Sequence, residues 1–219
     1  MYETPIEIEP THEGAHRRRL FDGMARAVAQ QGWVDCTIAD IVREAGVSKR
    51  TFYEHFQTKS DCLVALYESA SRNALRHLDS VLDPNRHWQD QVESAMTAYL
   101  GVLAENPIML RALFIDILGL GSQGLAARRR VNVAVADFLL GVVNPMRDDR
   151  VMSPSMAMAV VGGINELVLQ LIEQDRIDDI HTITQTTSAL IRAVVGHGAA
   201  DHTRTAKTVW GARSQAPTA

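Results

Sequence analysis

Cysteine is scarce in this sequence, and its scarcity excludes two kinds of structure. Only Cys36 and Cys62 occur among the 219 residues, and they form neither a CxxC pair nor a cluster with histidine. A disulfide framework and a zinc site both need more ligands of this kind. We therefore expect no disulfide and no metal, and we interpret both cysteines as small packing residues.

Long apolar runs are also missing. No run reaches the ~20 residues that a membrane span requires. The first fifteen residues carry four glutamates and no lysine or arginine, which does not fit a secretory signal. Hydrophobic residues nevertheless make up 46% of the chain, enough for a sizeable core. We expect a folded, cytoplasmic protein without a membrane partner.

Positive charge is in deficit overall, but it is unevenly distributed. The net charge of −4 argues against a protein that coats nucleic acid. Residues 16–60 nevertheless hold eight Lys or Arg against five Asp or Glu, a net charge of +3, whereas residues 1–15 carry −4 and residues 61–219 carry −3. The basic excess is therefore confined to one short segment.

That segment has the spacing of three helices. Helical periodicity begins at Arg17 and stops at Gly32. Thr37 and Asp40 have the spacing of a capping box and predict the start of a second, short helix. Ala-Gly-Val at 45–47 interrupts it, and Ser48 can then cap a third helix. Two short helices joined by a turn that contains glycine indicate a helix-turn-helix.

The rest of the chain also favours helices. Thr58 and Asp61 repeat the capping-box spacing and open a longer helix. Helical spacing then continues in the segments 86–105, 107–118, 123–143, 154–175 and 178–196. The prediction is an all-α protein with a three-helix N-terminal domain and a helical-bundle domain. Its expected limits are a flexible arm at 1–15, the helix-turn-helix domain at 16–60, the bundle at 61–196 and a disordered tail at 197–219.

The third predicted helix has two distinct faces. Phe52 and Phe56 lie within about 40° of each other on a helical projection and should point inward. Lys49 and Tyr53, four residues apart, share a flank at the solvent boundary. A helix of this kind suits the DNA major groove, where its first turn reaches base edges and its flanks touch phosphate.

Lys59 opens the next predicted helix, and its charge opposes the helix dipole at that end. Stability of its own helix is therefore a poor reason for this lysine. An external phosphate is a better one, because the amides of a helix N-terminus also bind phosphate. Of the three arginines at 17–19, which point in different directions on a helix, we expect one to touch DNA.

The stretch "TIADIVREAGVSKRTFYEHFQTKSDCL", preceded by "LFDGMARAVAQQGW", resembles the DNA-binding domain of the TetR (tetracycline repressor) family over roughly residues 17–63. The resemblance implies a homodimer that binds a double-stranded operator and represses transcription until a small-molecule effector binds. A two-fold dimer in turn requires an inverted-repeat operator. An activator of the same fold is the alternative.

The resemblance also implies roles for single residues. Those that contact phosphate or support such contacts are Thr37, Ser48, Tyr53, His55 and Lys59, and the candidates for base edges are Lys49, Arg50 and Thr51. His55 is equally well explained as a packed support. The family often has glycine or alanine where Arg50 stands, so the sequence leaves open whether this arginine reads guanine or contacts phosphate.

One motif favours a different class of protein. "GLGSQG" at 119–124 fits GxGxxG and raises the alternative of a dinucleotide-binding enzyme. That fold needs a strand before the glycines and an acid about 20 residues further on. Here the preceding segment has helical spacing, and Asn144 and Pro145 stand at that distance. We interpret the motif as a loop between helices, and expect no catalytic residues, no enzyme and no cofactor.

The C-terminal segments predict a dimer interface and a ligand site. "AVVGGINELVLQLI" at 159–172 combines small residues with an aliphatic stripe, which allows close helix packing. The expected interface residues are Gly162, Gly163, Leu167, Ile183, Thr187, Leu190 and Val194. We expect a mostly apolar ligand among the helices that follow residue 80, near Trp88, Met96, Tyr99, Phe114, Phe138 and Asn165, although ordinary core packing explains each of these residues as well. Asn165 is costly to bury without a partner, so it faces solvent, pairs across the dimer or meets the ligand.

Overall fold

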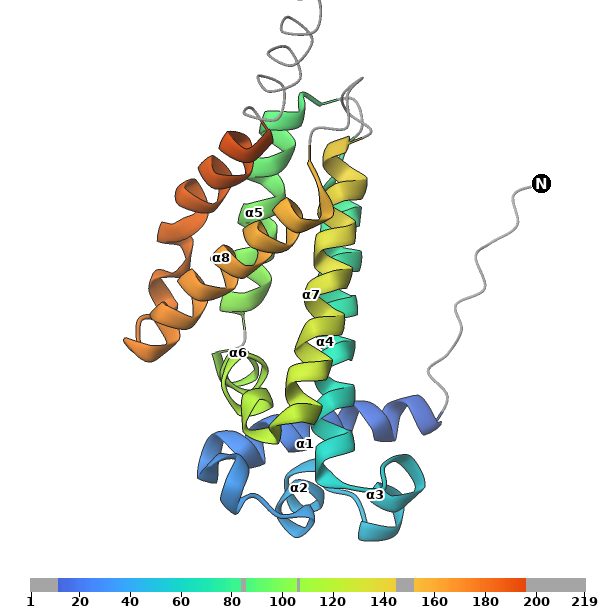
Figure 1. Ribbon diagram of the computed structural model, residues 1–219. Coiled ribbons are helices and arrows are strands. Elements are labelled where there is room, and N and C mark those ends of the chain that lie inside the picture. The colour runs from blue at the N-terminus through green and yellow to red at the C-terminus, as the bar shows by residue number, and fades with distance from the viewer. Residues whose placement is uncertain (1–11, 84–85, 106, 145–151, 196–219) are drawn as a thin grey trace, which may run out of the picture. The chain divides into compact units, whose positions relative to one another are not determined.

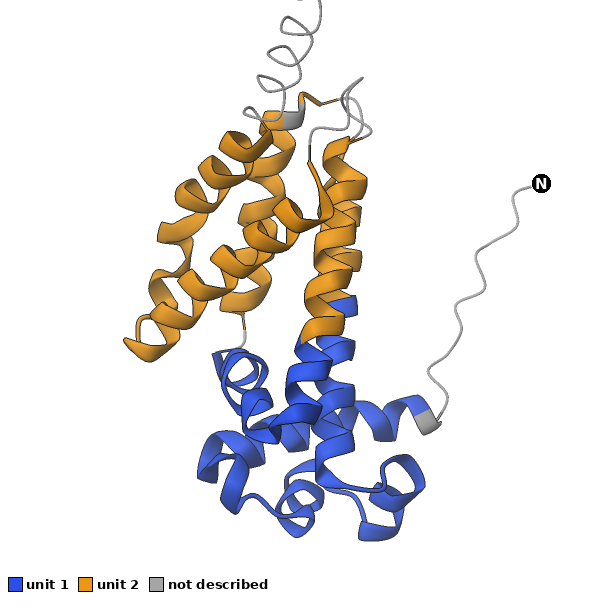
Figure 2. Ribbon diagram, in the orientation of Figure 1, with its two compact units in different colours: residues 1–72, 106–128 blue, residues 73–105, 129–219 orange. Residues whose placement is uncertain are grey.

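The computed structural model describes residues 12–83, 86–105, 107–144 and 152–195, and every element within these ranges is a helix (Figure 1). The helices form two compact units (Figure 2). Unit 1 contains residues 1–72 and 106–128, and unit 2 contains residues 73–105 and 129–219. The all-α prediction is confirmed for the described residues. The predicted domain limits stay predictions, and the expected arm at 1–11 and tail at 197–219 lie outside the described residues.

Unit 1 contains the predicted helix-turn-helix, formed by α2 (Ile38–Ala45) and α3 (Lys49–His55). Thr37 caps α2, because its hydroxyl accepts from the Asp40 N–H at 3.3 Å while the Asp40 carboxylate accepts from the Thr37 N–H at 3.0 Å. Gly46 ends α2 in the left-handed region at φ 61°. Ser48 Oγ accepts from the Thr51 N–H at 3.0 Å and caps α3. The caps expected from the sequence are confirmed.

The helix-turn-helix packs on the first helix, α1 (His12–Asp35). Leu20 and Met24 of α1, Ile41 of α2 and Phe52 of α3 are completely buried. A side chain of this size contributes about 1.5–3 kcal/mol when it leaves water. A Cβ at Gly23 would lie 2.7 Å from the Cβ of Ala45, so this glycine permits the close approach of α1 and α2.

The ends of α1 differ in part from the expectation. The helix begins at His12 rather than Arg17, because apolar periodicity only starts at Leu20 and places the start too late. At Gly32 the backbone leaves the helical region, with φ 78° and ψ 164°, and a further turn continues to Asp35. The helix that begins at His12 thus breaks at Gly32, as predicted, and a short helical turn follows it.

Three further elements complete unit 1. The start of α4 (Lys59–Val81) has the second predicted capping box, in which Thr58 N–H donates to Asp61 Oδ2 at 3.0 Å and Asp61 N–H donates to Thr58 Oγ1 at 3.1 Å. The other two are α6 (Pro107–Phe114) and the 3₁₀ turn η1 (Asp116–Leu120), followed by the first residues of α7 (Ser122–Val143).

The glycine motif at 119–124 connects η1 to α7. Gly121 takes φ 59°, and a Cβ at Gly124 would lie 1.8 Å from the carbonyl oxygen of Ile117. Both glycines are therefore explained by a tight turn whose backbone approaches the helix that follows it. No strand flanks the motif in the described part of the chain, so the dinucleotide-binding alternative lacks the element it requires.

Unit 2 consists of α5 (Trp88–Ala104), α8 (Pro154–Glu173), η3 (Ile177–Ile183) and a helix at 184–195, together with residues from α4 and α7. The predicted helix 178–196 thus begins as a 3₁₀ helix. The core of this unit gathers apolar side chains from α5, α7, α8 and the last helix, including Val92, Met96, Val143, Val160, Ile164, Ile191 and Val195.

Helix α8 is long and apolar enough to cross a membrane by length and composition alone. Its apolar run is interrupted by Asn165, Glu166 and Gln170, so the expectation of no uninterrupted run of ~20 apolar residues holds for α8. The core helix of a soluble protein passes the same test. Val160, Ile164 and Val168 of α8 are buried within unit 2, which is the arrangement of a core helix.

The two cysteines pack inside unit 1. Cys36 is 1% exposed and Cys62 is fully buried, and both are free thiols. Burial raises the pKa of Cys36 to about 11, and it raises the pKa of Cys62 as well. Because the thiolate is the reactive form, both side chains act as packing residues, as expected.

Candidate nucleic-acid interface and apolar cavity

Helix α3 exposes the face that the sequence assigned to DNA. Lys49 and Arg50 are exposed, Thr51 is half-buried, and Tyr53 keeps 58% of its surface accessible. The Tyr53 ring meets the Phe52 ring edge-on, with centroids 5.6 Å apart. The buried phenylalanine thus anchors a helix whose outer face carries two cations and a phenol.

Arg50 has a partner on the same face. Its Nε donates to Glu54 Oε1 at 3.1 Å across one helical turn. The two side chains remain 90% and 54% exposed. The pair therefore lies at the outer surface of α3 and not against the core.

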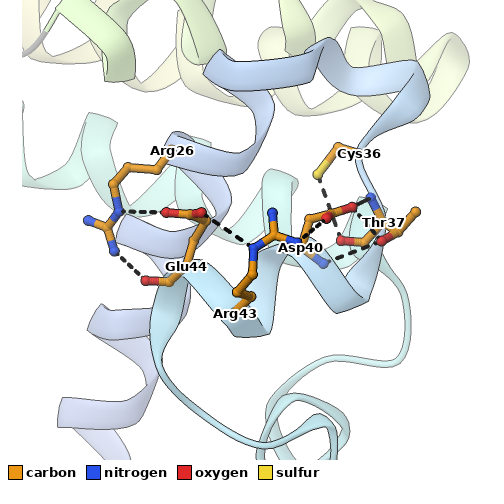
Figure 3. A network of polar contacts seen from close by, with 6 residues as sticks. All are labelled: Arg26, Cys36, Thr37, Asp40, Arg43 and Glu44. Atoms are coloured by element: carbon orange, nitrogen blue, oxygen red, sulfur yellow. Dashed lines mark hydrogen bonds and ion pairs between the residues drawn. The ribbon is translucent and has the colours of Figure 1, made fainter.

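A polar network supports the first helix of the motif (Figure 3). The Thr37 hydroxyl donates to Asp40 Oδ2 at 2.5 Å, and Arg43 Nη1 donates to Asp40 Oδ1 at 2.8 Å. Arg26 of α1 lies 3.6 Å from the Glu44 carboxylate and donates to the Glu44 carbonyl at 2.6 Å. The Thr37 hydroxyl is thus engaged in capping, which assigns it a supporting role.

Hydrogen bonds to Thr37 lower the pKa of the Asp40 carboxyl from 3.8 to about 2, and Arg43 adds to this effect. The carboxylate is therefore ionised at neutral pH and keeps the α2 cap closed.

Lys59 does not need an external phosphate. Its ammonium donates to the carbonyl oxygens of Trp33 at 2.9 Å, Val34 at 3.3 Å and Cys36 at 2.7 Å. An ammonium has three donors, and these three carbonyls lie in and just after the short turn that follows the kink at Gly32. These contacts give Lys59 a supporting position within unit 1, and its contact with phosphate stays a prediction.

His55 and two of the three N-terminal arginines also have partners within unit 1. The His55 ring lies 6.2 Å from the Phe56 ring and 6.4 Å from the His16 ring, and it is half-buried, as a packed support would be. Arg17 lies over the Phe56 ring at 5.5 Å. Arg19 Nε donates to the Ala45 carbonyl at 3.0 Å, at the turn of the motif. Arg18 is exposed, and remains the candidate among the three for contact with DNA.

Unit 2 encloses an apolar cavity of about 60 Å³. Four sets of side chains line it: Leu78 from α4; Gln91, Val92, Ala95, Met96 and Tyr99 from α5; Val135, Phe138, Leu139, Val142 and Val143 from α7; and Val161, Ile164, Asn165 and Ile191 from the last two helices. None of these described residues is Asp, Glu, Lys, Arg or His. The wall therefore offers no charged group to a ligand.

The cavity agrees with part of the expected ligand site. Met96, Tyr99, Phe138 and Asn165 line it. Phe114 does not, because it belongs to α6 in unit 1. The side chain of Trp88 lies outside the described residues. The aliphatic residues of α7 were missed because they look like ordinary core residues, although Val135, Leu139 and Val142 follow helical spacing.

Two buried amides in the cavity wall have partners within unit 2. Asn165 Nδ2 donates to Asn132 Oδ1 at 3.1 Å, which joins α8 to α7. Gln91 accepts from the Asp83 N–H at 3.2 Å and donates to the Arg86 carbonyl at 3.2 Å. The Asn165 side chain is thus buried and paired within the chain. It neither faces solvent nor needs a partner across a dimer.

The predicted dimer face is only partly available on the surface. Gly162 is exposed, and a Cβ there would meet nothing within 4 Å. Gly163, Leu167, Ile183, Leu190 and Val194 are half-buried. Thr187 is fully buried, and its hydroxyl donates to the carbonyls of Ile183 and Thr184, each at 3.0 Å. The Thr187 side chain is therefore not accessible to a partner subunit at the expected interface.

The fold and the exposed face of α3 define a helix-turn-helix protein. Residues 20–66 match the family model described as bacterial regulatory proteins, tetR family. The match covers the helix-turn-helix region, in which the sequence resembles this family.

Two curated relatives each match about a third of this chain. The chain is 28% identical over 80 residues to the uncharacterized HTH-type transcriptional regulator YxbF of Bacillus subtilis (strain 168), covering 36% of this chain and 21% of YxbF. It is 34% identical over 77 residues to the HTH-type transcriptional regulator BetI of Brucella canis, covering 35% of this chain and 37% of BetI. The chain thus spans well under half the length of either relative.

Solved structures match more of the chain. The transcriptional regulator FadR from Bacillus subtilis, in complex with stearoyl-CoA, superposes with a TM-score of 0.70 at 14% identity, covering 80% of this chain and 96% of FadR. The regulatory protein TetR from Rhodobacter sphaeroides superposes with a TM-score of 0.63 at 20% identity, covering 80% of this chain and 98% of that one. These similarities establish a shared fold.

Proposed function

We propose that the protein is a cytoplasmic transcriptional regulator that binds a DNA operator and releases it when a small, mostly apolar molecule binds unit 2. The observation that carries this proposal is the outer face of α3, where Lys49, Arg50 and Tyr53 are exposed over a buried Phe52. No catalytic role is assigned to any residue.

The proposed contacts with DNA divide into two groups. Lys49, Arg50 and Thr51 stand in the first turn of α3, from which a recognition helix reaches base edges in the major groove. Tyr53 and Ser48 flank that turn and are assigned to phosphate, which orients the protein without reading sequence. Thr37, His55 and Lys59 support the motif through their contacts within unit 1.

The regulator is proposed to act as a homodimer on an inverted repeat. A two-fold dimer presents two copies of α3, and these must enter major grooves about one helical turn apart. Gly162 supports a close helix contact between subunits, since its exposed position leaves room for a partner helix. Gly163, Leu167, Leu190 and Val194 would border that contact.

The chemistry of the cavity in unit 2 sets the proposed ligand. A charge buried there would have no partner among the described lining residues, which would cost several kcal/mol. The buried part of the ligand is therefore neutral, and Tyr99, Asn165 and Gln91 provide the polar groups near it. The stearoyl-CoA in the solved structure of FadR is a ligand of this kind, because it joins a neutral apolar chain to a charged group.

The size of the cavity adds a second condition. Small-molecule sites usually measure 300–1,000 Å³, and this cavity holds about 60 Å³. A ligand of ordinary size must therefore displace lining side chains. We propose that this displacement changes the separation of the DNA-binding domains, which makes ligand and operator compete. The same coupling with opposite sign would give an activator.

The test begins with selection of duplexes from a random library by the full-length protein. We expect an inverted repeat that binds roughly 10³-fold or more tighter than random duplex. A reporter gene placed behind that repeat should be repressed by the protein, and increased expression would instead identify an activator. Equal affinity for the selected and random duplexes would contradict the proposed function.

A further inference from the structure

The hydrogen bond between Arg50 and Glu54 on the surface of α3 is not explained by a contribution to the stability of the helix. Both residues are exposed, and their 3.1 Å contact lies on the outer face of the helix. Exposed pairs of this kind contribute little, because water screens the charges and two long side chains lose freedom.

Helix electrostatics oppose the placement of both members of the pair. Arg50 stands in the first turn of α3, which contains no acidic residue, although the helix dipole favours anions there. An acid placed before its basic partner stabilises a helix better than the reverse order, and here the arginine comes first. The structure also contains the favoured order, since Glu68 precedes Arg72 in α4 at 4.0 Å.

Glu54 has a further cost if α3 binds DNA. A carboxylate on the outer face of a recognition helix approaches the phosphates of the duplex, which repel it. A residue that weakens both the helix and nonspecific binding needs another role, and its contact with Arg50 supplies one.

We propose that Arg50 and Glu54 form one base-reading unit, in which Glu54 positions the guanidinium so that Arg50 recognises a guanine. Glu54 engages Nε at 3.1 Å, and the Arg50 side chain is 90% exposed, so the donors of Nη1 and Nη2 remain for another partner. A guanidinium presents two parallel N–H groups from that end, and guanine offers O6 and N7 as matching acceptors in the major groove. Arg50 is the specificity-determining residue, and Glu54 is a positioning residue.

This inference rests on the proposed operator binding and assigns one of its base contacts. It assigns Arg50 to a base and not to a phosphate. A phosphate contact depends mainly on positive charge, which a neighbouring carboxylate reduces, so it gives less reason for a carboxylate that holds Nε.

The experiment starts from the duplex that the full-length wild-type protein selects. Each base pair of one half-site is then changed in turn, and affinity is measured for wild type, Arg50→Ala, Arg50→Lys and Glu54→Gln. Wild type should lose affinity when one particular guanine is replaced. Arg50→Ala should abolish that preference, a loss of roughly 5- to 150-fold in discrimination.

The two conservative variants separate base reading from charge. Arg50→Lys keeps the charge but cannot form the two parallel bonds, so discrimination should fall while the salt dependence stays as in wild type. Glu54→Gln should reduce discrimination at the same guanine and leave binding to random duplex equal or tighter. Arg72→Ala removes a second Arg–Glu pair at the same spacing, in α4, and should change neither property.

Two results would overturn the inference. The first is that Arg50→Ala weakens binding to every duplex alike and lowers the slope of log affinity against log salt by about 1, as expected for a lost phosphate contact. The second is that Glu54→Gln leaves the base profile unchanged. If wild type selects no sequence at all, the proposed function itself fails, which is a different outcome from a selected duplex whose guanine does not depend on Arg50.

Discussion

Lys59 Nζ lies 2.9 Å from the carbonyl oxygen of Trp33 and 4.3 Å from the centroid of the Trp33 ring. A single ammonium thus contacts the last turn of α1 through both backbone and indole. Charge-assisted hydrogen bonds are roughly twice as strong as neutral ones, and the cation–π contact adds to them. This relationship fixes the start of α4 against the end of α1 within unit 1.

Replacing Lys59 by Met should therefore reduce stability while leaving the DNA contacts in place. Met keeps much of the apolar stem but leaves three carbonyls without their donor, so the free energy of unfolding should fall by about 1–3 kcal/mol. Urea unfolding measures the loss. The salt dependence of operator binding should be unchanged under conditions where the variant is folded. If stability is unchanged and the slope of log affinity against log salt falls by about 1, Lys59 contacts phosphate.

The cap of α2 should weaken in acid. The pKa of Asp40 is about 2 in the folded chain, below its ordinary 3.8, because Thr37 donates to the carboxylate. The ionised cap therefore stabilises the fold fully above about pH 4, and this contribution is lost as the pH falls through 2. Asp40→Asn should be less stable at neutral pH, and the difference should shrink between pH 4 and pH 2. Thermal unfolding by circular dichroism at each pH measures it, with the exposed Asp79→Asn as control. A constant difference across this range would contradict the assignment.

Tyr53 should bind phosphate through its hydroxyl. Tyr53→Phe keeps the edge-on contact with Phe52 and removes only the oxygen. Affinity should fall by about 0.5–1.5 kcal/mol for operator and random duplex alike, because a phosphate contact carries no sequence information. The salt slope should stay the same, since no charge is lost. A selective loss for operator would instead indicate that Tyr53 contacts a base edge.

The sequence predicted unit 1 well because its signals are local. Thr37, Gly46 and Ser48 each determine a helix end through atoms no more than four residues away, and the inward faces of Phe52 and Phe56 follow from helical geometry. The partners of Lys59 were not predicted because Trp33 lies 26 residues away. The helix-dipole argument considered only the helix that begins at Lys59, whereas this lysine donates hydrogen bonds to carbonyls at the end of α1.

The cavity in unit 2 was less predictable for a related reason. Aromatic residues drew attention in the sequence, yet Phe114 belongs to the other unit, while Val135 and Leu139 line the cavity. Periodicity shows that a residue is buried but does not show whether it packs against core or faces a void. The burial of Thr187 was missed similarly, because its hydroxyl is satisfied by carbonyls of its own helix and of η3, a local arrangement that leaves no sequence pattern.

Gly162 should control dimer formation. A leucine side chain at Gly162 meets nothing within the protomer at its Cβ, so Gly162→Leu should fold normally and prevent close approach of a partner helix. Light scattering should then show more monomer, and operator affinity should fall. Gly101→Leu is a matched control, since Gly101 is an exposed helical glycine with an equally open Cβ. A dimer that persists with intact operator binding would place Gly162 outside the interface.

Tyr99 should affect the ligand response without affecting operator binding. It combines ring area with a hydroxyl in the otherwise apolar wall of α5, so Tyr99→Phe should preserve the cavity and remove one polar contact. Inducer potency should fall by about 0.5–1.5 kcal/mol, roughly 2- to 12-fold, while affinity for the selected duplex without ligand stays unchanged.

A ligand is first identified by screening neutral apolar compounds and apolar chains with charged ends for release of that duplex. It is then titrated against free and operator-bound wild type. Because coupling is reciprocal, the ligand must bind the DNA complex more weakly by the same factor by which it weakens DNA binding. Equal ligand affinities in the two states would refute ligand-driven release, and a Tyr99→Phe variant with unchanged potency would place the polar part of the ligand elsewhere in the cavity.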